Sequence, residues 1–319
     1  MTRVLVAGIP RSGTTWVGRT LGHAEGAVYV DEPDNENLRS LALRAKRGLG
    51  RFPVLAPGDS ADTYELLWAR AFGGGMPHPP LLRDRIAARL FDDGRSRNVS
   101  AMASYGSLPV RLRLAAALAP TRPRPDPPLD VVVKSVHAAL AVGWIVERHH
   151  PQVVVVLRHP FSVLASQAAM GLPDGDRALD QSRTVARRLL EPWGVDPPPP
   201  TAPPLARAAW QLGLLVTALA KAAALHPGWT VVRHEELCAT PEACFRGLCQ
   251  RLGLRWTDSL AQFLEASNRP GSGFRTDRVA AEEVERWRSR LTSEQRDQVR
   301  SALSAFPLAT EGYEVFEGP

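Results

Sequence analysis

The sequence VLVAGIPRSGTTW, residues 4–16, joins a short apolar run to a turn rich in glycine and hydroxyl side chains. The run is uninterrupted and rich in valine, as in a strand buried on both faces of a sheet. Gly8 and Gly13 have the spacing of the nucleotide-binding loop G-x-x-x-x-G-K-[ST], but Thr14 replaces its lysine and a cation stands earlier, at Arg11. A strand that turns through glycine into a helix directs backbone N–H groups at one place. The stretch therefore predicts an anion site built without the usual lysine.

The rest of the chain alternates short apolar runs with segments of helical periodicity. Strands are expected at 4–7, 131–133, 153–157 and 230–232, with a further short β-like run just before Asp31. Helices are expected at about 12–22, 137–149, 161–170, 205–225, 241–252 and 280–305. This order predicts an α/β, P-loop-like three-layer fold with a central, mostly parallel sheet and helices on both faces. We expect a single domain over 1–319, with a helical or lid insertion at about 33–125.

Composition and charge favour an anionic ligand over nucleic acid. The formal net charge is +6, and no long run of like charge suggests a binding tail. Nearly all cations are arginines, since the only lysines are Lys46, Lys134 and Lys221. We expect no nucleic-acid partner and either a monomer or a homodimer.

The predicted location is cytoplasmic. The cysteines Cys238, Cys244 and Cys249 lie close together on one expected region of helix and cannot join distant elements, which favours a reducing compartment. The first strand begins at about the third residue, which leaves no room for a signal peptide. No apolar stretch approaches the ~18 residues of a membrane span.

The turn itself resembles a known loop. PRSGTTW, residues 10–16, is similar to the 5′-phosphosulfate loop P-[KR]-[ST]-G-T-T-[WL] of sulfotransferases that use 3′-phosphoadenosine 5′-phosphosulfate (PAPS). These enzymes move a sulfuryl group to a hydroxyl or amine and release the product PAP without a metal. The resemblance implies that the donor is held by the loop residues Arg11, Ser12, Gly13, Thr14, Thr15 and Trp16. Trp16 is equally suited to the core.

A second motif follows a later strand. VVVVLRHPFSVLASQ, residues 153–167, resembles the family's 3′-phosphate site, in which an arginine and a serine eight residues later bind the phosphate. Arg158 and Ser166 have that spacing. The arginine leaves the carboxyl end of a strand and the serine lies two helical turns further on, so both can face one phosphate.

Lys134 ends the apolar run VVVK and is predicted to place a point charge on the phosphosulfate. The alternative is a surface cation. Similar enzymes carry a lysine or a histidine in this region, so His137 is a weaker catalytic candidate. It could equally be a satisfied histidine on a helix.

A general base must take the acceptor's proton. VYVDEPDNENL, residues 28–38, supplies Asp31 and Glu32 after a short β-like run. Glu32 follows Arg11 by 21 residues, the interval found in tyrosylprotein sulfotransferases, which share the loop PRSGTT. We therefore predict Glu32 as the base and Asp31 as the second candidate. The alternative is that EPDNEN forms a solvated turn.

Two later segments resemble the family more weakly. TVVRHEEL, residues 230–237, is similar to a strand that ends in Y-E-D-L, with His234 in place of the tyrosine, able to stack on adenine or donate to it. RPGSGFRTDRV, residues 269–279, resembles the segment that closes over the nucleotide, which suggests Ser272, Gly273 and Arg275 as ligands.

The sequence therefore predicts a metal-independent, PAPS-dependent sulfotransferase acting on a small-molecule, lipid or glycan hydroxyl. Two alternatives stay open: a P-loop kinase-like phosphotransferase that uses ATP, and a non-catalytic nucleotide-binding protein. Apolar and aromatic residues of the insertion either line an acceptor pocket or pack a helix on the sheet; they are Tyr64, Leu67, Trp68, Phe72, Met76 and Leu81.

Overall fold

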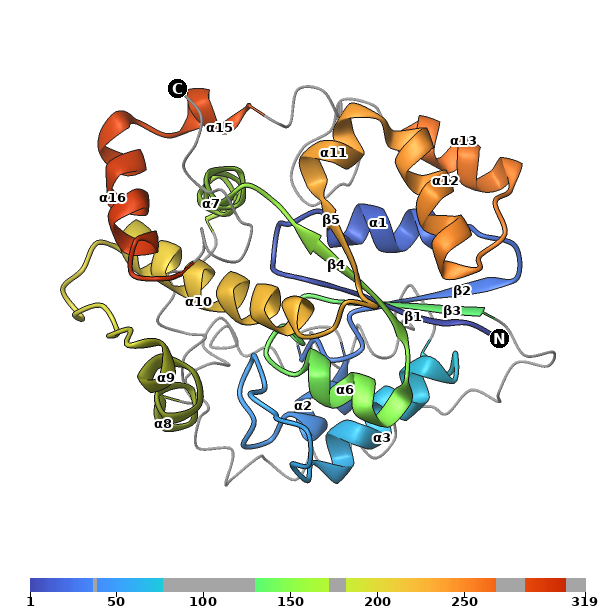
Figure 1. Ribbon diagram of the computed structural model, residues 1–319, viewed down its shortest axis with the longest axis horizontal. Coiled ribbons are helices and arrows are strands. Elements are labelled where there is room, and N and C mark those ends of the chain that lie inside the picture. Colours follow the sequence, from blue (N-terminus) through green and yellow to red (C-terminus); the bar gives the residue numbers. More distant parts are fainter. Residues whose placement is uncertain (37–38, 77–129, 172–181, 268–284, 308–319) are drawn as a thin grey trace.

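A parallel sheet forms the centre of the molecule (Figure 1). The computed structural model describes residues 1–36, 39–76, 130–171, 182–267 and 285–307. Within these ranges five strands pair in the order β2-β3-β1-β4-β5, and every pair is parallel. The strands are β1 (Arg3–Gly8), β2 (Ala27–Asp31), β3 (Asp130–Ser135), β4 (Gln152–Leu157) and β5 (Thr230–Arg233). The expected strands are confirmed, each longer by one to three residues.

Side chains of the central strands alternate between two buried layers. In β1, Val4 and Val6 face one layer, whereas Leu5 and Ala7 face the other. The first layer holds α1 (Thr14–Leu21), α12 (Pro241–Leu252) and α13 (Asp258–Ser267). The second holds α2 (Ser40–Ala45), α3 (Asp62–Phe72), α6 (Val142–His149) and α10 (Pro204–Ala224). Both faces of the sheet are covered, as strands that are apolar throughout require, so the predicted three-layer α/β fold is confirmed.

The connections after β1 and β4 leave the sheet on opposite sides. β1 leads into α1 in the first layer, whereas β4 leads into α7 (Pro160–Ala168), whose apolar side chains lie in the second layer. The two strands are neighbours, with Gly8 in register with Val156. In open α/β sheets ligands bind outside the carboxyl ends of strands at such a reversal. The fold therefore directs attention to the edge between β1 and β4.

Helix α3 explains the aromatic residues of the expected insertion. Five apolar and aromatic residues of the insertion are buried in the second layer, against Val131 and Val133 of β3: Tyr64, Leu67, Trp68, Phe72 and Met76. For these residues the packing alternative is confirmed, while Leu81 lies outside the described residues.

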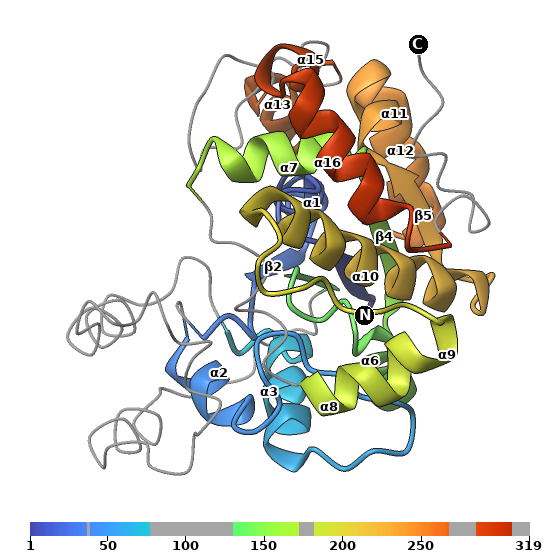
Figure 2. The same cartoon turned by 90° about the vertical axis from the view of Figure 1, so that its left-hand side faces the viewer.

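The last expected helix is divided into two shorter helices. The segment expected as one helix over 280–305 contains α15 (Trp287–Arg290) and α16 (Ser293–Leu303) in its described part. The break occurs at Thr292, whose Oγ1 accepts from the Gln295 amide at 3.2 Å while Gln295 Oε1 accepts from the Thr292 amide at 2.9 Å. This capping box, T-S-E-Q, starts a new helix that packs along α10 (Figure 2).

The remaining described elements are α8 (Ser182–Val185), the π-helical turn η4 (Ala186–Leu190), α9 (Glu191–Trp193) and α11 (His234–Ala239). None of the helices in the described ranges is both long and apolar enough to cross a membrane.

Candidate functional site

The loop after β1 presents unpaired donors at the start of α1. Gly13 is the N-cap, with φ 93°, and its carbonyl accepts from the amides of Trp16 and Val17 at 3.0 and 3.2 Å. The amides of Thr14 and Thr15 precede these first helical bonds, so the helix itself offers them no acceptor. Ser12 Oγ is buried and has no hydrogen-bond partner among the described residues. Such a group of amides and hydroxyls at a helix start suits an anion.

The two glycines of the loop are required by close packing. A Cβ on Gly8 would lie 2.5 Å from Thr14 Cγ2 and 2.7 Å from Ser12 Oγ. A Cβ on Gly13 would lie 2.2 Å from Cδ2 of His234. Arg11 also has a left-handed backbone, with φ 74°, which is uncommon for a residue with a side chain. The loop is therefore held in one compact shape.

The first and second sequence motifs meet at the edge between β1 and β4. Nε of Arg11 donates to Oγ of Ser166 at 2.9 Å, and Nη1 of Arg158 donates to the Arg11 carbonyl at 3.2 Å. Nε2 of Gln167 also donates to the carbonyl of Pro10, at 3.3 Å. Arg158 and Ser166 are buried. Three of the predicted ligands thus form one cluster.

His234 lies against the same loop. Its ring contacts the position of Gly13, and its Nδ1 is 3.5 Å from Sγ of Cys238. Burial, with a smaller contribution from Arg158, holds the pKa of His234 well below its usual value, so the ring is neutral. A neutral imidazole at this place adds no charge to the loop.

Trp16 packs against the first helical layer, with its ring centroid 6.0 Å from that of His234. Its Nε1 donates to Oγ of Ser267 at 3.0 Å, and its ring meets Phe245 edge-on, with centroids 5.2 Å apart. These contacts are those of a packed side chain, and the role of Trp16 as a donor ligand stays a prediction.

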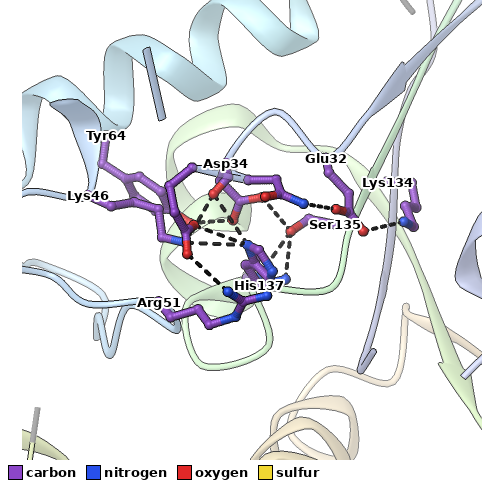
Figure 3. Close-up of polar contacts among 11 residues, drawn as sticks. Glu32, Asp34, Lys46, Arg51, Tyr64, Lys134, Ser135 and His137 are labelled. Atoms are coloured by element: carbon purple, nitrogen blue, oxygen red, sulfur yellow. Dashed lines mark hydrogen bonds and ion pairs between the residues drawn. The ribbon is translucent and has the colours of Figure 1, made fainter. Parts of the chain in front are cut away.

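Lys134 pairs with Asp31, the last residue of β2, and with Glu32, the residue after it; we call these three residues the ionic trio. Nζ of Lys134 lies 2.6 Å from Oε1 of Glu32 (Figure 3) and 3.2 Å from Oδ1 of Asp31. The lysine side chain is 3% exposed, so the surface-cation alternative is wrong. The parallel pairing of β2 with β3, in which Asp31 is in register with Lys134, brings these groups together. The trio carries one net negative charge when all three groups are ionised.

Both oxygens of the Glu32 carboxylate have partners. Oε1 accepts from Lys134 and Oε2 from Nδ2 of Asn35. Burial raises the pKa of Glu32, but Lys134 and His137 outweigh it, and the pKa falls to about 2. Burial likewise lowers the pKa of Lys134, but its two carboxylates raise it above the usual value. Glu32 is therefore ionised and weakly basic in this arrangement.

The turn that carries Glu32 is buried rather than solvated. Asp34 accepts from Oγ of Ser135 at 2.7 Å and from the Tyr64 hydroxyl at 3.0 Å. Nζ of Lys46 pairs with Oε2 of Glu36 at 2.7 Å and donates to the Asp34 carbonyl at 3.0 Å. Figure 3 shows these side chains converging from β3, α3, the end of α2 and the turn. For residues 32–36, the described part of EPDNEN, the solvated-turn alternative is wrong.

His137 belongs to this buried network. Its Nδ1 lies 3.4 Å from Nζ of Lys46 and 3.5 Å from Oε2 of Glu36. It precedes α6, which begins at Val142, because Ser135 Oγ accepts from the amides of His137 and Ala138 and holds a turn there. The expected helical start at 137 is wrong. The satisfied histidine that the sequence allowed is present, on a turn.

Asn35 and Arg39 also contact the trio, and neither was predicted. Asn35 donates to Glu32, and Nη2 of Arg39 donates to the Asp31 carbonyl at 3.2 Å. A usable signal was the density of polar residues directly after a strand end. The predicted ligands Ser272, Gly273 and Arg275 lie outside the described residues.

Comparisons with known proteins give structural similarity only. No family model matches the sequence, and no curated protein matches it. Among solved structures, the chain is similar to the sulfotransferase domain from the curacin biosynthetic pathway, with 15% identity, a TM-score of 0.45 and coverage of 95% of this chain and 98% of that one. It is also similar to the sulfotransferase domain of the Synechococcus PCC 7002 olefin synthase, with 14% identity, a TM-score of 0.41 and 94% coverage of each chain.

A third similar structure is retinol dehydratase in complex with androsterone and inactive cofactor PAP, at 15% identity and a TM-score of 0.39, covering 95% of this chain and 79% of that one. Identities and TM-scores at this level carry no functional assignment. The function proposed below rests on the residues of the chain itself.

Proposed function

We propose that this chain is a PAPS-dependent sulfotransferase that transfers a sulfuryl group to a hydroxyl of a small-molecule, lipid or glycan acceptor. One observation carries the proposal: Arg11 of the first motif contacts Ser166 of the second, and Arg158 contacts the backbone of Arg11. A donor with phosphate groups at its 5′ and 3′ ends needs two anion sites close together. The ATP-using alternative accounts for the first motif but gives the second no role.

The residues present are suited to that donor. The amides of Thr14 and Thr15, with Ser12 Oγ, offer hydrogen bonds to the phosphosulfate end. Arg158 and Ser166 offer a guanidinium and a hydroxyl to the 3′-phosphate. His234 lies beside the loop, where its neutral ring can stack on the adenine of the donor or donate a hydrogen bond to it. Ser272, Gly273 and Arg275 stay proposed as further ligands.

The donor supplies an activated sulfur whose bond to the bridging phosphate oxygen breaks. Glu32 takes the proton of the acceptor hydroxyl as its oxygen bonds to that sulfur, and the electron pair of the broken bond stays on the departing phosphate. Lys134 and Arg11 stabilise the charge that grows there. Asp31 is the second candidate for the base. These roles need no metal. We further propose that residues 1–319 form a single enzyme domain and that the protein is cytoplasmic and either monomeric or homodimeric.

Calorimetry with PAP tests the donor. We expect PAP to bind, and Arg158→Ala and Ser166→Ala each to weaken it by about tenfold or more, since hydrogen bonds to charged groups contribute about 1.5–3 kcal/mol. Arg255→Ala is the matched control, because Arg255 is an exposed arginine paired with Glu25 on the surface. Tight binding of ATP with magnesium and none of PAP would contradict the proposal and favour the kinase-like alternative.

The acceptor is best sought directly. Purified protein incubated with PAPS labelled in the sulfuryl group and an extract of its own cell should yield a labelled product, which mass spectrometry identifies. Glu32→Gln should abolish the labelling while PAP still binds. If PAP binds but no acceptor is ever labelled, the non-catalytic nucleotide-binding alternative gains.

A further inference from the structure

The predicted base and the predicted cation are bound to each other. Glu32 Oε1 is 2.6 Å from Nζ of Lys134, and its other oxygen accepts from Asn35. A general base needs an oxygen that can face the acceptor's proton and enough basicity to take it. Neither condition is met while Lys134 holds the carboxylate. A change at Lys134 must therefore accompany catalysis if Glu32 is the base.

Lys134 is also placed beside the anion site. β3 is a neighbour of β1, and the stem of Lys134 packs against α1, where a Cβ on Gly18 would lie 3.0 Å from Lys134 Cβ. Gly18 lies one helical turn after Thr14, whose amide opens the helix. A lysine carries three donors on a flexible stem, so a small rotation can redirect its ammonium.

The charges around this ammonium are not balanced. Asp31 and Glu32 both pair with Lys134, and Arg39 reaches the backbone carbonyl of Asp31. A donor with a phosphosulfate and a 3′-phosphate is a polyanion. When this donor binds, Lys134 is already paired with Glu32. The donor and the Glu32 carboxylate would then both attract the Lys134 ammonium.

We infer that the donor nucleotide competes with Glu32 for the ammonium of Lys134, so that nucleotide binding releases the carboxylate and makes it available as the base. The inference rests on the proposed function and adds the regulation of its base. The pairing with Lys134 prevents Glu32 from acting as a base before the donor has bound. Because coupling between two sites is reciprocal, removing the charge of Glu32 must tighten nucleotide binding.

Calorimetric PAP affinities of the wild type and four variants test this. Glu32→Gln keeps the size of the side chain but removes its charge, and we expect it to tighten PAP binding by about tenfold, a common size for coupling between sites. Glu25→Gln removes the same charge from an exposed residue paired with Arg255 and should leave the affinity unchanged. In a Lys134→Met background, Glu32→Gln should lose most of its effect, because no ammonium is left to contest.

The outcomes separate this inference from the proposed function. Glu32→Gln binding PAP no more tightly than the wild type, or tightening it equally with and without Lys134, overturns the competition while PAP binding itself stands. Absence of PAP binding in every folded variant overturns the proposed function as well. If Lys134→Met does not fold, the comparison of Glu32→Gln with Glu25→Gln decides alone.

Discussion

Nε of Arg11 and Oγ of Ser166 lie 2.9 Å apart, although the two residues are separated by 155 positions in the chain. The contact joins the loop after β1 to α7, and Gln167 reinforces it through the carbonyl of Pro10. Two elements that leave the sheet on opposite faces are thereby held together at one edge. The geometry of the candidate nucleotide site depends on this bridge.

The bridge can be tested with a substitution that keeps the charge. Arg11→Lys retains a cation but loses the Nε donor and the planar fork, so we expect PAP affinity to fall by about tenfold. Ser166→Ala removes the other partner. Since both changes act on one contact, the double variant should bind PAP much more tightly than the product of the two losses predicts. Full additivity would show that the two side chains act independently.

Gly13 should tolerate no side chain. Gly13→Ala adds a Cβ 2.2 Å from Cδ2 of His234 at a backbone with φ 93°. Gly26→Ala is the matched control, since Gly26 has φ 72° but no atom within 4 Å of the new Cβ. Both variants carry the left-handed strain of about 1–2 kcal/mol, and Gly13→Ala should lose a further ~1–3 kcal/mol to overpacking. Denaturant unfolding measures the difference.

A double variant identifies the cause of that loss. His234→Ala removes the ring that the new Cβ meets, so Gly13→Ala should destabilise the His234→Ala protein by no more than Gly26→Ala destabilises the wild type. An unchanged penalty in that background would place the strain elsewhere in the loop.

The buried pair of Lys46 and Glu36 should be costly to break. Lys46→Met leaves the buried Glu36 carboxylate with His137 and Arg51 as its remaining ionic partners among the described residues, and we expect about 3–5 kcal/mol of lost stability. Replacing both residues, as in Lys46→Met with Glu36→Leu, should cost less than Lys46→Met alone. Arg255→Met breaks an exposed pair and should cost at most ~1 kcal/mol. Chemical denaturation of the variants distinguishes these cases.

Stability should fall as the solution is acidified from pH 6.5 to about 4. Burial, then Arg288 and Arg158, lower the pKa of His159 from 6.5 to about 4, and its ring stacks on Trp287 with centroids 5.2 Å apart. The unfolded chain binds the proton first, so the contribution is complete above pH 6.5 and lost below it, by roughly 3 kcal/mol for His159. His234, whose pKa is also lowered by burial, should likewise lose its contribution to stability as the pH falls. His159→Asn should flatten the pH dependence of the unfolding free energy; an unchanged slope would contradict this.

The sequence was sufficient for the strands but not for every helix or for all the contacts between elements. Each predicted strand exists, and parallel strands bring their carboxyl ends to one edge, so Arg11, Lys134 and Arg158 could be assigned to that edge from position alone. The pairing of Lys134 with Glu32 could not be predicted, because it depends on β2 and β3 being neighbours. Strand order is set by the packing of whole layers, which no short pattern encodes.

The buried turn was harder still. Asp34 is satisfied by Ser135 and Tyr64, which are 101 and 30 positions away. Judged locally, the run EPDNEN is a polar turn, and only distant partners make its burial possible. The break at Thr292, by contrast, had a local signal, since T-S-E-Q is a capping box that overrides the continuous periodicity around it.

The central position of β1 divides the work of the molecule. On one side, β3 and β2 contribute the lysine and the carboxylates; on the other, β4 and β5 lead to Arg158 and His234. If the proposed roles are right, the 3′-phosphate and adenine contacts lie on one half of the sheet, whereas the acceptor base and the lysine that it shares with the donor lie on the other. New acceptor preferences can then evolve, or be engineered, through the β2 edge while the contacts to the 3′-phosphate and adenine stay intact.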